Sequence, residues 1–194
     1  PQSVLDAAAG HQAPGGGMGY FKPSDDYADP YLSAYTALAF NWLSAAGYQV
    51  PSEVEAKLHG YLLDLLRHDT APDFYDRGML SDVRATALAA LAQHQKVTKD
   101  DLLRFAPHMK RMSLMGKAQF LAAANALGET DIARQTLDAI LASGVESGGK
   151  FSFNESIDDG YKRILATPLR DNCAVLSSLL SYGDTELTGD KPMK

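Results

Sequence analysis

The chain has 194 residues, with 45% hydrophobic and 22% charged residues, which fits one folded globular domain or a large part of one and argues against bulk disorder. The formal net charge is −6 and no basic face is evident, so binding to nucleic acid is not expected. The single cysteine excludes an intramolecular disulfide and a Cys₂His₂ zinc site.

The first predicted helix follows Asp29-Pro30. Asp29 can accept a hydrogen bond from a free backbone amide as the N-cap, and Pro30 suits the first helical position, where no amide hydrogen is needed. We expect the helix at 31–43, ending near Gly47, with apolar neighbours on most of its sides. Helical spacing predicts a buried stripe of Tyr31, Tyr35, Leu38 and Trp42.

Caps and periodic apolar residues predict helices over most of the remaining chain. Ser52 and Glu55 have the spacing of a capping box, and Thr98 and Asp101 repeat it. Thr167-Pro168 repeats the cap and proline of the first helix. The expected helices are 52–67, one that starts near Ser81-Asp82, 98–106, 113–127, 131–142 and 168–182.

Short turns join these helices in pairs, which predicts an all-α fold of stacked αα-hairpins. Strand signals are confined to 18–21 and 150–153, which could form small edge ribbons. Residues 183–194 are polar, with two glycines and a proline, and are expected to be a tail or linker after a domain at 1–182.

One acidic run suggests a metal site. Residues 25–29, Asp-Asp-Tyr-Ala-Asp, match the DDxxD pattern, in which carboxylates on a helix hold magnesium and a diphosphate. Pro23 precedes the run and Pro30 follows it, so we expect a loop in which Asp29 serves as a helix cap, and no metal site.

Other short patterns have simpler structural interpretations. Glycines at 15–19 lack the Gly-Lys-Ser/Thr ending of a P-loop and the βαβ context of a dinucleotide site, so we expect a tight turn close to another surface. Cys173 is expected to be a small core residue near Leu169 and Leu176, although its place in the second helical turn leaves a reactive thiol as the alternative. Surface or hydrogen-bonded roles are expected for His11, His59, His68, His94 and His108.

Targeting signals are not visible. No apolar run reaches the ~18 residues of a transmembrane helix, and the N-terminal residues have no basic region followed by an apolar stretch. The chain begins with Pro1 rather than methionine, so we expect a processed chain or an excised piece of a larger protein.

Three sequence blocks occur in an order typical of one family: GGMGYF at 16–21, DPYLSAY at 29–35 and AGYQVP at 46–51. Together they resemble the thioester-containing domain of bacterial alpha-2-macroglobulins. Leu169-Arg170-Asp171 resembles a further feature of that family, and the resemblance covers about 5–182. It implies a complement-like α/α toroid of the terpenoid cyclase/prenyltransferase type, incomplete at its N-terminal end.

The resemblance also implies a function. Members of the family are broad-spectrum endopeptidase inhibitors in host defence, in which a bait region is cut and an internal Cys–Gln thioester then acylates a lysine of the attacking protease. It implies a single-use trap rather than an enzyme, without cofactor or metal. The implied partners are target proteases and other domains of the parent chain. The implied location is the periplasm, with membrane contact only through a lipid anchor outside this chain, on an inner-membrane lipoprotein.

The Cys-x-Glu-Gln thioester motif of that family does not occur here, and Cys173 is followed by Ala-Val-Leu. Either the chain begins after the motif or the parent lacks a thioester, so we expect no covalent activity from this chain alone. Tyr20, Phe21, Tyr31 and Tyr35 are expected to line the toroid end where a thioester would sit, the alternative being that Tyr31 and Tyr35 are core residues. The residues that match the family blocks are Gly16, Gly17, Gly19, Tyr20, Asp29, Pro30, Tyr31 and Tyr35.

Two other functions fit a helical chain. One is an interaction scaffold of the tetratricopeptide kind, because 116–133 looks like one repeat, although the 34-residue period fails elsewhere. The other is an α/α-toroid enzyme such as a terpene cyclase or glycosidase, which needs paired carboxylates that Asp25, Asp26, Asp158 and Asp159 could supply. A fragment that lacks its first helices is also expected to expose apolar surface and to self-associate.

Overall fold

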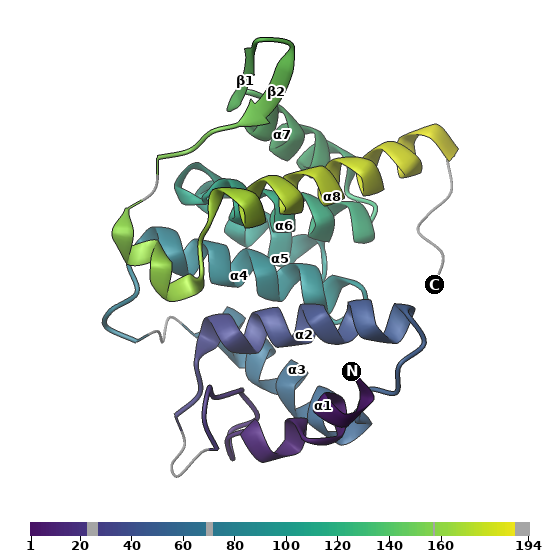
Figure 1. The fold of residues 1–194 in the computed structure, drawn as a ribbon. Coiled ribbons are helices and arrows are strands. Elements are labelled where there is room, and N and C mark those ends of the chain that lie inside the picture. The colour runs from purple at the N-terminus through teal and green to yellow at the C-terminus, as the bar shows by residue number, and fades with distance from the viewer. Residues whose placement is uncertain (23–26, 69–71, 157, 189–194) are drawn as a thin grey trace. The chain divides into compact units, whose positions relative to one another are not determined.

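The computed structural model describes residues 1–22, 27–68, 72–156 and 158–188 (Figure 1). The regular structure of these residues is helical apart from one two-stranded ribbon, so the all-α prediction is confirmed. The chain forms two compact units, Pro1–Phe74 and Tyr75–Lys194. Among the described residues, no helix has both the length and the apolar character needed to cross a bilayer.

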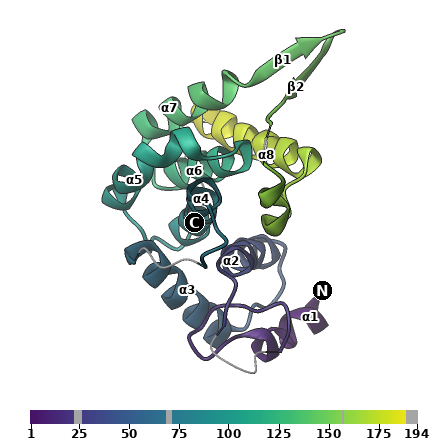
Figure 2. The same ribbon diagram turned by 90° about the vertical axis from the view of Figure 1, so that its left-hand side faces the viewer.

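The first unit is built on an αα-hairpin, with α2 and α3 packed against each other (Figure 2). The Asp29 carboxylate accepts a hydrogen bond from Leu32 N at 2.8 Å, and Pro30 is the first residue of α2, which confirms the predicted cap and proline. The helices of this unit are α1 (Gln2–Asp6), the 3₁₀ helix η1 (Ala8–His11), α2 (Pro30–Ala45) and α3 (Ser52–Arg67).

Two details of this hairpin differ from the prediction. Trp42 is 49% exposed, whereas Ala34, Leu38 and Phe40 are among the buried residues of α2. The capping box at Ser52 is wrong: Pro51 occupies the N-cap position and Ser52 already lies inside the first turn, so no side chain caps α3.

Helix α6 lies at the centre of the second unit and packs against α4, α7 and α8. Ser113 caps it, and Gly128, at φ +70°, follows its C-terminal end, both as predicted. The elements are α4 (Arg77–Ala92), α5 (Lys99–Phe105), η2 (Ala106–Arg111), α6 (Leu114–Ala126), α7 (Thr130–Leu141), β1 (Gly144–Ser147), β2 (Lys150–Phe153), η3 (Asp159–Ile164) and α8 (Pro168–Thr188).

Two helix starts in this unit test the predictions made from capping patterns. The Thr98 amide donates to the Asp101 carboxylate at 2.8 Å, so this capping box is confirmed. The predicted start of the next-earlier helix near Ser81-Asp82 is wrong, because α4 begins one turn earlier, where the Asp76 carboxylate accepts from Met79 N at 2.8 Å. Asp82 is therefore in the body of α4.

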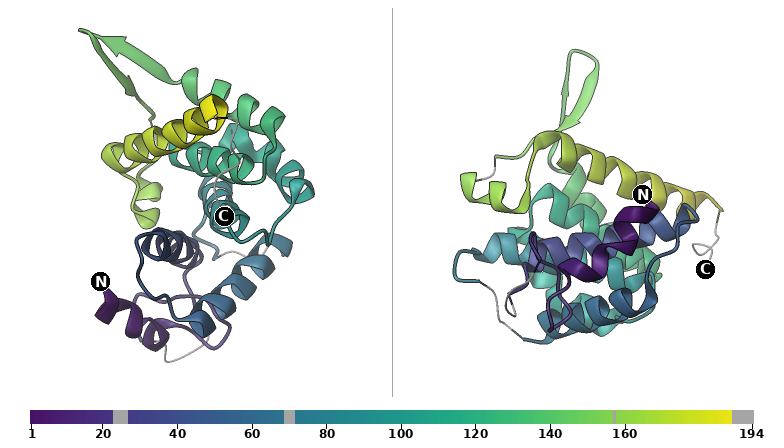
Figure 3. Two further views of the ribbon diagram at one scale, coloured as in Figure 1. Left: turned by 90° about the vertical axis from the view of Figure 1, so that its right-hand side faces the viewer. Right: turned by 60° about the horizontal axis from the view of Figure 1, so that its bottom comes forward.

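The predicted strand at 150–153 pairs with β1 in an antiparallel ribbon, with Gly144 opposite Phe153 and Ser147 opposite Lys150. Figure 3 shows this ribbon extending away from α7 and α8. The other predicted strand, 18–21, forms only a single bridge between Met18 and Gln12.

Helix α8 differs most from its predicted role. It continues to Thr188, six residues past the predicted end at 182, and so includes the first part of the segment expected to be a tail. Cys173 is exposed rather than buried, because α8 turns Asp171, Val175 and Ser178 inward and leaves the opposite face open. At helical spacing along that face lie Leu169, Cys173, Leu176 and Leu180.

Candidate functional site

The glycine turn of the first unit packs tightly on α3. Gly16 has φ +91°, and a Cβ built on it would lie 2.4 Å from the carbonyl oxygen of Lys57. A Cβ on Gly17 would lie 2.5 Å from the Cβ of Ala28 and 2.9 Å from the Tyr61 ring. The expectation of a turn that closely approaches another surface is confirmed.

Hydrogen bonds join this turn to the start of α2. Met18 N donates to Ser33 Oγ at 2.8 Å, and Asp29 N donates to Met18 O at 2.9 Å. Ser33 Oγ in turn donates to Asp29 O at 2.7 Å. Asp29 is buried and its carboxylate is used as the helix cap, whereas Asp25 and Asp26 of the acidic run lie outside the described residues.

An apolar pocket of about 360 Å³ lies beside the turn, between α1–η1 and α2. Of the four aromatic residues predicted to share one site, Tyr20 and Tyr35 line this pocket. Tyr31 is buried and stacks on Tyr35 with ring centroids 5.8 Å apart, and Phe21 is 84% exposed. Other lining residues are Val4, Leu5, Ala8, His11, Met18, Gly19, Leu32, Thr36, Ala39, Phe40 and Leu43.

The hydroxyls of Tyr20 and Tyr61 stay protonated at neutral pH. Partial burial, with the nearby Asp29 charge as a smaller cause, raises the pKa of Tyr20 above its usual value. Burial and then Asp29 raise the pKa of Tyr61 to about 12. These groups can therefore donate hydrogen bonds, but they are not bases or nucleophiles at neutral pH.

Two of the four carboxylates considered for a glycosidase, Asp158 and Asp159, have local structural contacts. Asp158 accepts from Gly160 N at 2.7 Å and caps η3, and Asp159 forms an exposed ion pair with Lys162 at 2.8 Å. These contacts give Asp158 and Asp159 a structural role at the start of η3.

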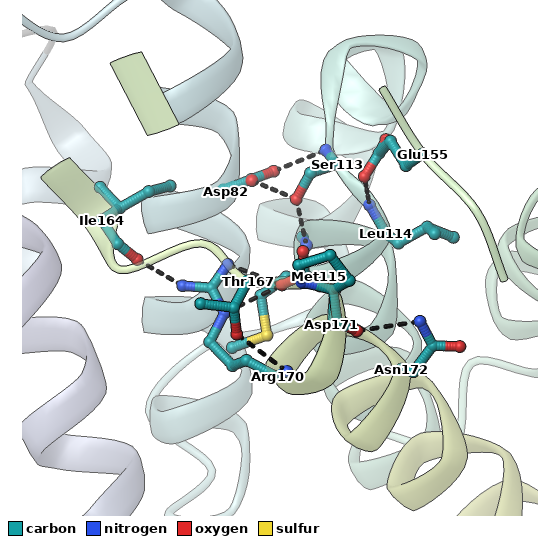
Figure 4. A network of polar contacts seen from close by, with 12 residues as sticks. Asp82, Ser113, Leu114, Met115, Glu155, Ile164, Thr167, Arg170, Asp171 and Asn172 are labelled. Atoms are coloured by element: carbon teal, nitrogen blue, oxygen red, sulfur yellow. Dashed lines mark hydrogen bonds and ion pairs between the residues drawn. The ribbon is translucent and has the colours of Figure 1, made fainter. Parts of the chain in front are cut away.

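The second unit contains a polar cluster that sequence reasoning missed (Figure 4). Asp82 is 1% exposed, and its two carboxylate oxygens accept hydrogen bonds from Ser113, one from the backbone amide at 2.9 Å and one from the hydroxyl. Beside it, Leu114 N donates to Glu155 Oε2 at 2.7 Å. A Cβ on Gly116 would lie 2.0 Å from Asp82 Oδ1, so only glycine permits this approach.

The start of α8 is tied to the same region. The Arg170 guanidinium donates to Asp171 Oδ1, at 2.9 Å from Nε and 2.7 Å from Nη2, and its Nη1 donates to Ile164 O. Asn172 accepts from Phe153 N at 3.0 Å and donates to Phe153 O at 2.9 Å. The end of the ribbon, η3 and α8 therefore share one set of contacts.

Burial dominates the electrostatics of this cluster. It raises the pKa of Asp82 to about 7, against the lowering effect of the two Ser113 hydrogen bonds, and the Glu155 charge raises it further. The pKa of Glu155 is also raised, first by partial burial, while the Leu114 amide and Lys117 act in the opposite direction. Burial and the surrounding carboxylates, Asp82 first among them, raise the pKa of Tyr161.

Comparison with known proteins gives a match in structure only. No family model matches the chain, and no curated protein is recognisably similar in sequence. The native E. coli alpha-2-macroglobulin is 20% identical with a TM-score of 0.76, over 96% of this chain and 12% of that one. An E. coli alpha-2-macroglobulin structure from domain MG7 to the C-terminus is also 20% identical with a TM-score of 0.76, over 98% of this chain and 31% of that one.

The Salmonella alpha-2-macroglobulin reacted with methylamine is 19% identical with a TM-score of 0.73, over 95% of this chain and 12% of that one. The chain thus spans about an eighth of the length of these large proteins. At this level of identity the likeness concerns the fold, and it agrees with the α/α-toroid class that the sequence blocks implied. The chain has the fold of one segment of the bacterial alpha-2-macroglobulins.

Proposed function

We propose that the chain is a helical domain of a bacterial alpha-2-macroglobulin-like endopeptidase inhibitor, which traps a protease after its bait region is cut. The observation that carries this proposal is that all three family-like sequence blocks meet in the first unit. The block at 16–21 packs on α3, the block at 29–35 opens α2, and the block at 46–51 connects the two helices.

The block at 46–51 is also joined to the N-terminal helix. Gln2 Nε2 donates to Gln49 O at 2.9 Å, and Gln49 N donates to Gln2 Oε1 at 3.1 Å. Together with the contacts of Met18 and Ser33, these bonds make α1, the glycine turn and the α2–α3 hairpin one structure. A shared fold over nearly the whole chain supports the same assignment.

In this proposal, the pocket lined by Tyr20 and Tyr35 faces the region that holds a thioester in those family members that have one. An apolar, aromatic wall would keep water from a thioester before release. This chain contains no Cys-x-Glu-Gln motif, so it would contribute the wall and not the reacting group. Its contribution would be structural, and the trap would turn over no substrate.

The proposed partners are attacking proteases and the other domains of the parent chain. Related structures of E. coli alpha-2-macroglobulin include forms activated by trypsin and by porcine elastase. The proposed location is the periplasm, on a lipid-anchored parent at the inner membrane. The fold matches favour this function over a tetratricopeptide-like scaffold or a toroid enzyme.

The test uses the complete parent protein, purified and mixed with trypsin. A trap leaves trypsin active on a small chromogenic peptide and inactive on a large protein substrate, because the enclosed protease admits only small molecules. If trypsin in the mixture cleaves the large substrate at its normal rate, the proposal is wrong. Pretreatment with methylamine then separates two mechanisms: loss of protease capture indicates a thioester, and unchanged capture indicates steric trapping.

A further inference from the structure

Two carboxylates from distant parts of the chain bind neighbouring backbone amides at the start of α6. Asp82, in α4, accepts from Ser113 N at 2.9 Å, and Glu155, which follows β2, accepts from Leu114 N at 2.7 Å (Figure 4). The two carboxylates thus bind consecutive amides of one helix start, and the Glu155 charge is among the causes that raise the pKa of Asp82. Each negative charge makes the other unfavourable.

The two carboxylates differ in their access to water. Asp82 is enclosed and has two hydrogen bonds from Ser113, whereas Glu155 is only partly buried and has the Leu114 amide as its partner. The positive charge of Arg170 lowers the pKa of Asp82, but the Arg170 guanidinium also binds Asp171 and Ile164 O. The charged groups that act on the pair are Lys117, Arg170 and Asp171. Tyr161 interacts with both carboxylates, and Asp76 and Asp158 act on Tyr161.

We propose that Asp82 and Glu155 form a proton-dependent latch on the start of α6. While Asp82 is protonated, Glu155 is the only charged member of the pair and stays bound to Leu114 N. When Asp82 releases its proton to water, the pair carries two negative charges. Glu155 then leaves Leu114 N for water, because the partly buried side chain gains hydration by turning outward, whereas Asp82 is enclosed and keeps its charge buried.

Burial raises the pKa of Asp82 to about 7, so the latch changes state close to neutral pH. It is closed below that pH and open above it. Neighbouring anchors restrict the motion: Phe153 stays bound to Asn172, and Ile164 stays bound to Arg170. The loosening is therefore local to Glu155, and the helices of the unit keep their packing.

The test is an NMR titration of the 194-residue chain between pH 6 and 8. Carboxyl ¹³C signals report the protonation of Asp82 and Glu155, and hydrogen exchange of the Leu114 amide, corrected for its intrinsic pH dependence, reports the latch. We expect the protection of Leu114 to fall about tenfold or more as Asp82 titrates, the effect of a coupling worth one pKa unit. In Asp82→Asn the protection of Leu114 should not depend on pH.

A matched control is Asp131→Asn, which removes an exposed carboxylate from the first turn of α7 and should leave both readouts unchanged. Constant protection of Leu114 while the Asp82 signal titrates would overturn the latch. If Asp82→Asn does not fold, Glu155→Gln decides: Asp82 must titrate at lower pH in that variant, and an unchanged midpoint contradicts the proposal.

Discussion

Replacing Gly16 with alanine tests how the first unit is held together. Gly16 has φ +91°, and the added methyl group would lie 2.4 Å from the Lys57 carbonyl oxygen, which is part of α3. A left-handed conformation costs an alanine about 1–2 kcal/mol. The clash also moves the turn away from α3 and strains the hydrogen bond from Gln12 Nε2 to Val54 O, now 2.8 Å, which adds about 1 kcal/mol. The expected total loss is about 2–3 kcal/mol.

Urea unfolding followed by Trp42 fluorescence measures this loss, because Trp42 is the only tryptophan and lies on α2 of the same unit. The matched control is Gly15→Ala, one residue earlier, where no atom lies within 4 Å of the added methyl group. We expect that variant to stay within ~0.5 kcal/mol of the parent chain. If the two alanine variants differ by less than that, the turn does not depend on close packing and the reasoning fails.

Three further predictions concern single side chains. In the folded chain the pKa of Asp82, about 7, lies above its ordinary value, so protonated Asp82 stabilises the fold. This contribution to the free energy of unfolding is complete below pH ~4 and is lost as the pH rises through 7. The melting temperature of Asp82→Asn should lack this decline. Phe120→Ala removes a fully buried ring and should cost about 3–5 kcal/mol in chemical denaturation, whereas Phe21→Ala, at an exposed ring, should stay within ~0.5 kcal/mol. Cys173 should react with a thiol reagent in the native chain as fast as in urea, and protection before unfolding would contradict its exposure.

The sequence predicted those helices whose signals are local. Asp29-Pro30 marks the start of α2, and Thr98 with Asp101 marks that of α5, because a cap and its amide partners lie within one turn. Ser52 with Glu55 has the same pattern and failed, because Pro51 started the helix one position earlier. Local chemistry thus predicts that a helix exists better than it predicts its first residue.

Local sequence signals do not predict the polar cluster of Asp82, Ser113 and Glu155 in the second unit. Asp82 looks like a helix cap beside Ser81, yet its partner Ser113 is 31 residues away. Cys173 shows a related limit, since the spacing of α8 defines two apolar faces and only packing selects the one that is buried. The aromatic site was predicted in part, because Tyr20 and Tyr35 do line one pocket. The relation of this pocket to a thioester stays a prediction.

The open face of α8 has a practical consequence for handling the protein. Leu169 is 75% exposed, and Leu176 and Leu180 continue the same row, so we expect molecules in solution to attract one another through it. Mutual repulsion between chains of net charge −6 opposes this attraction at pH 7. Near pH 5.3 the repulsion vanishes, and the isolated chain should then be least soluble. Colloidal stability, rather than unfolding, is expected to set the lower pH limit for work in solution.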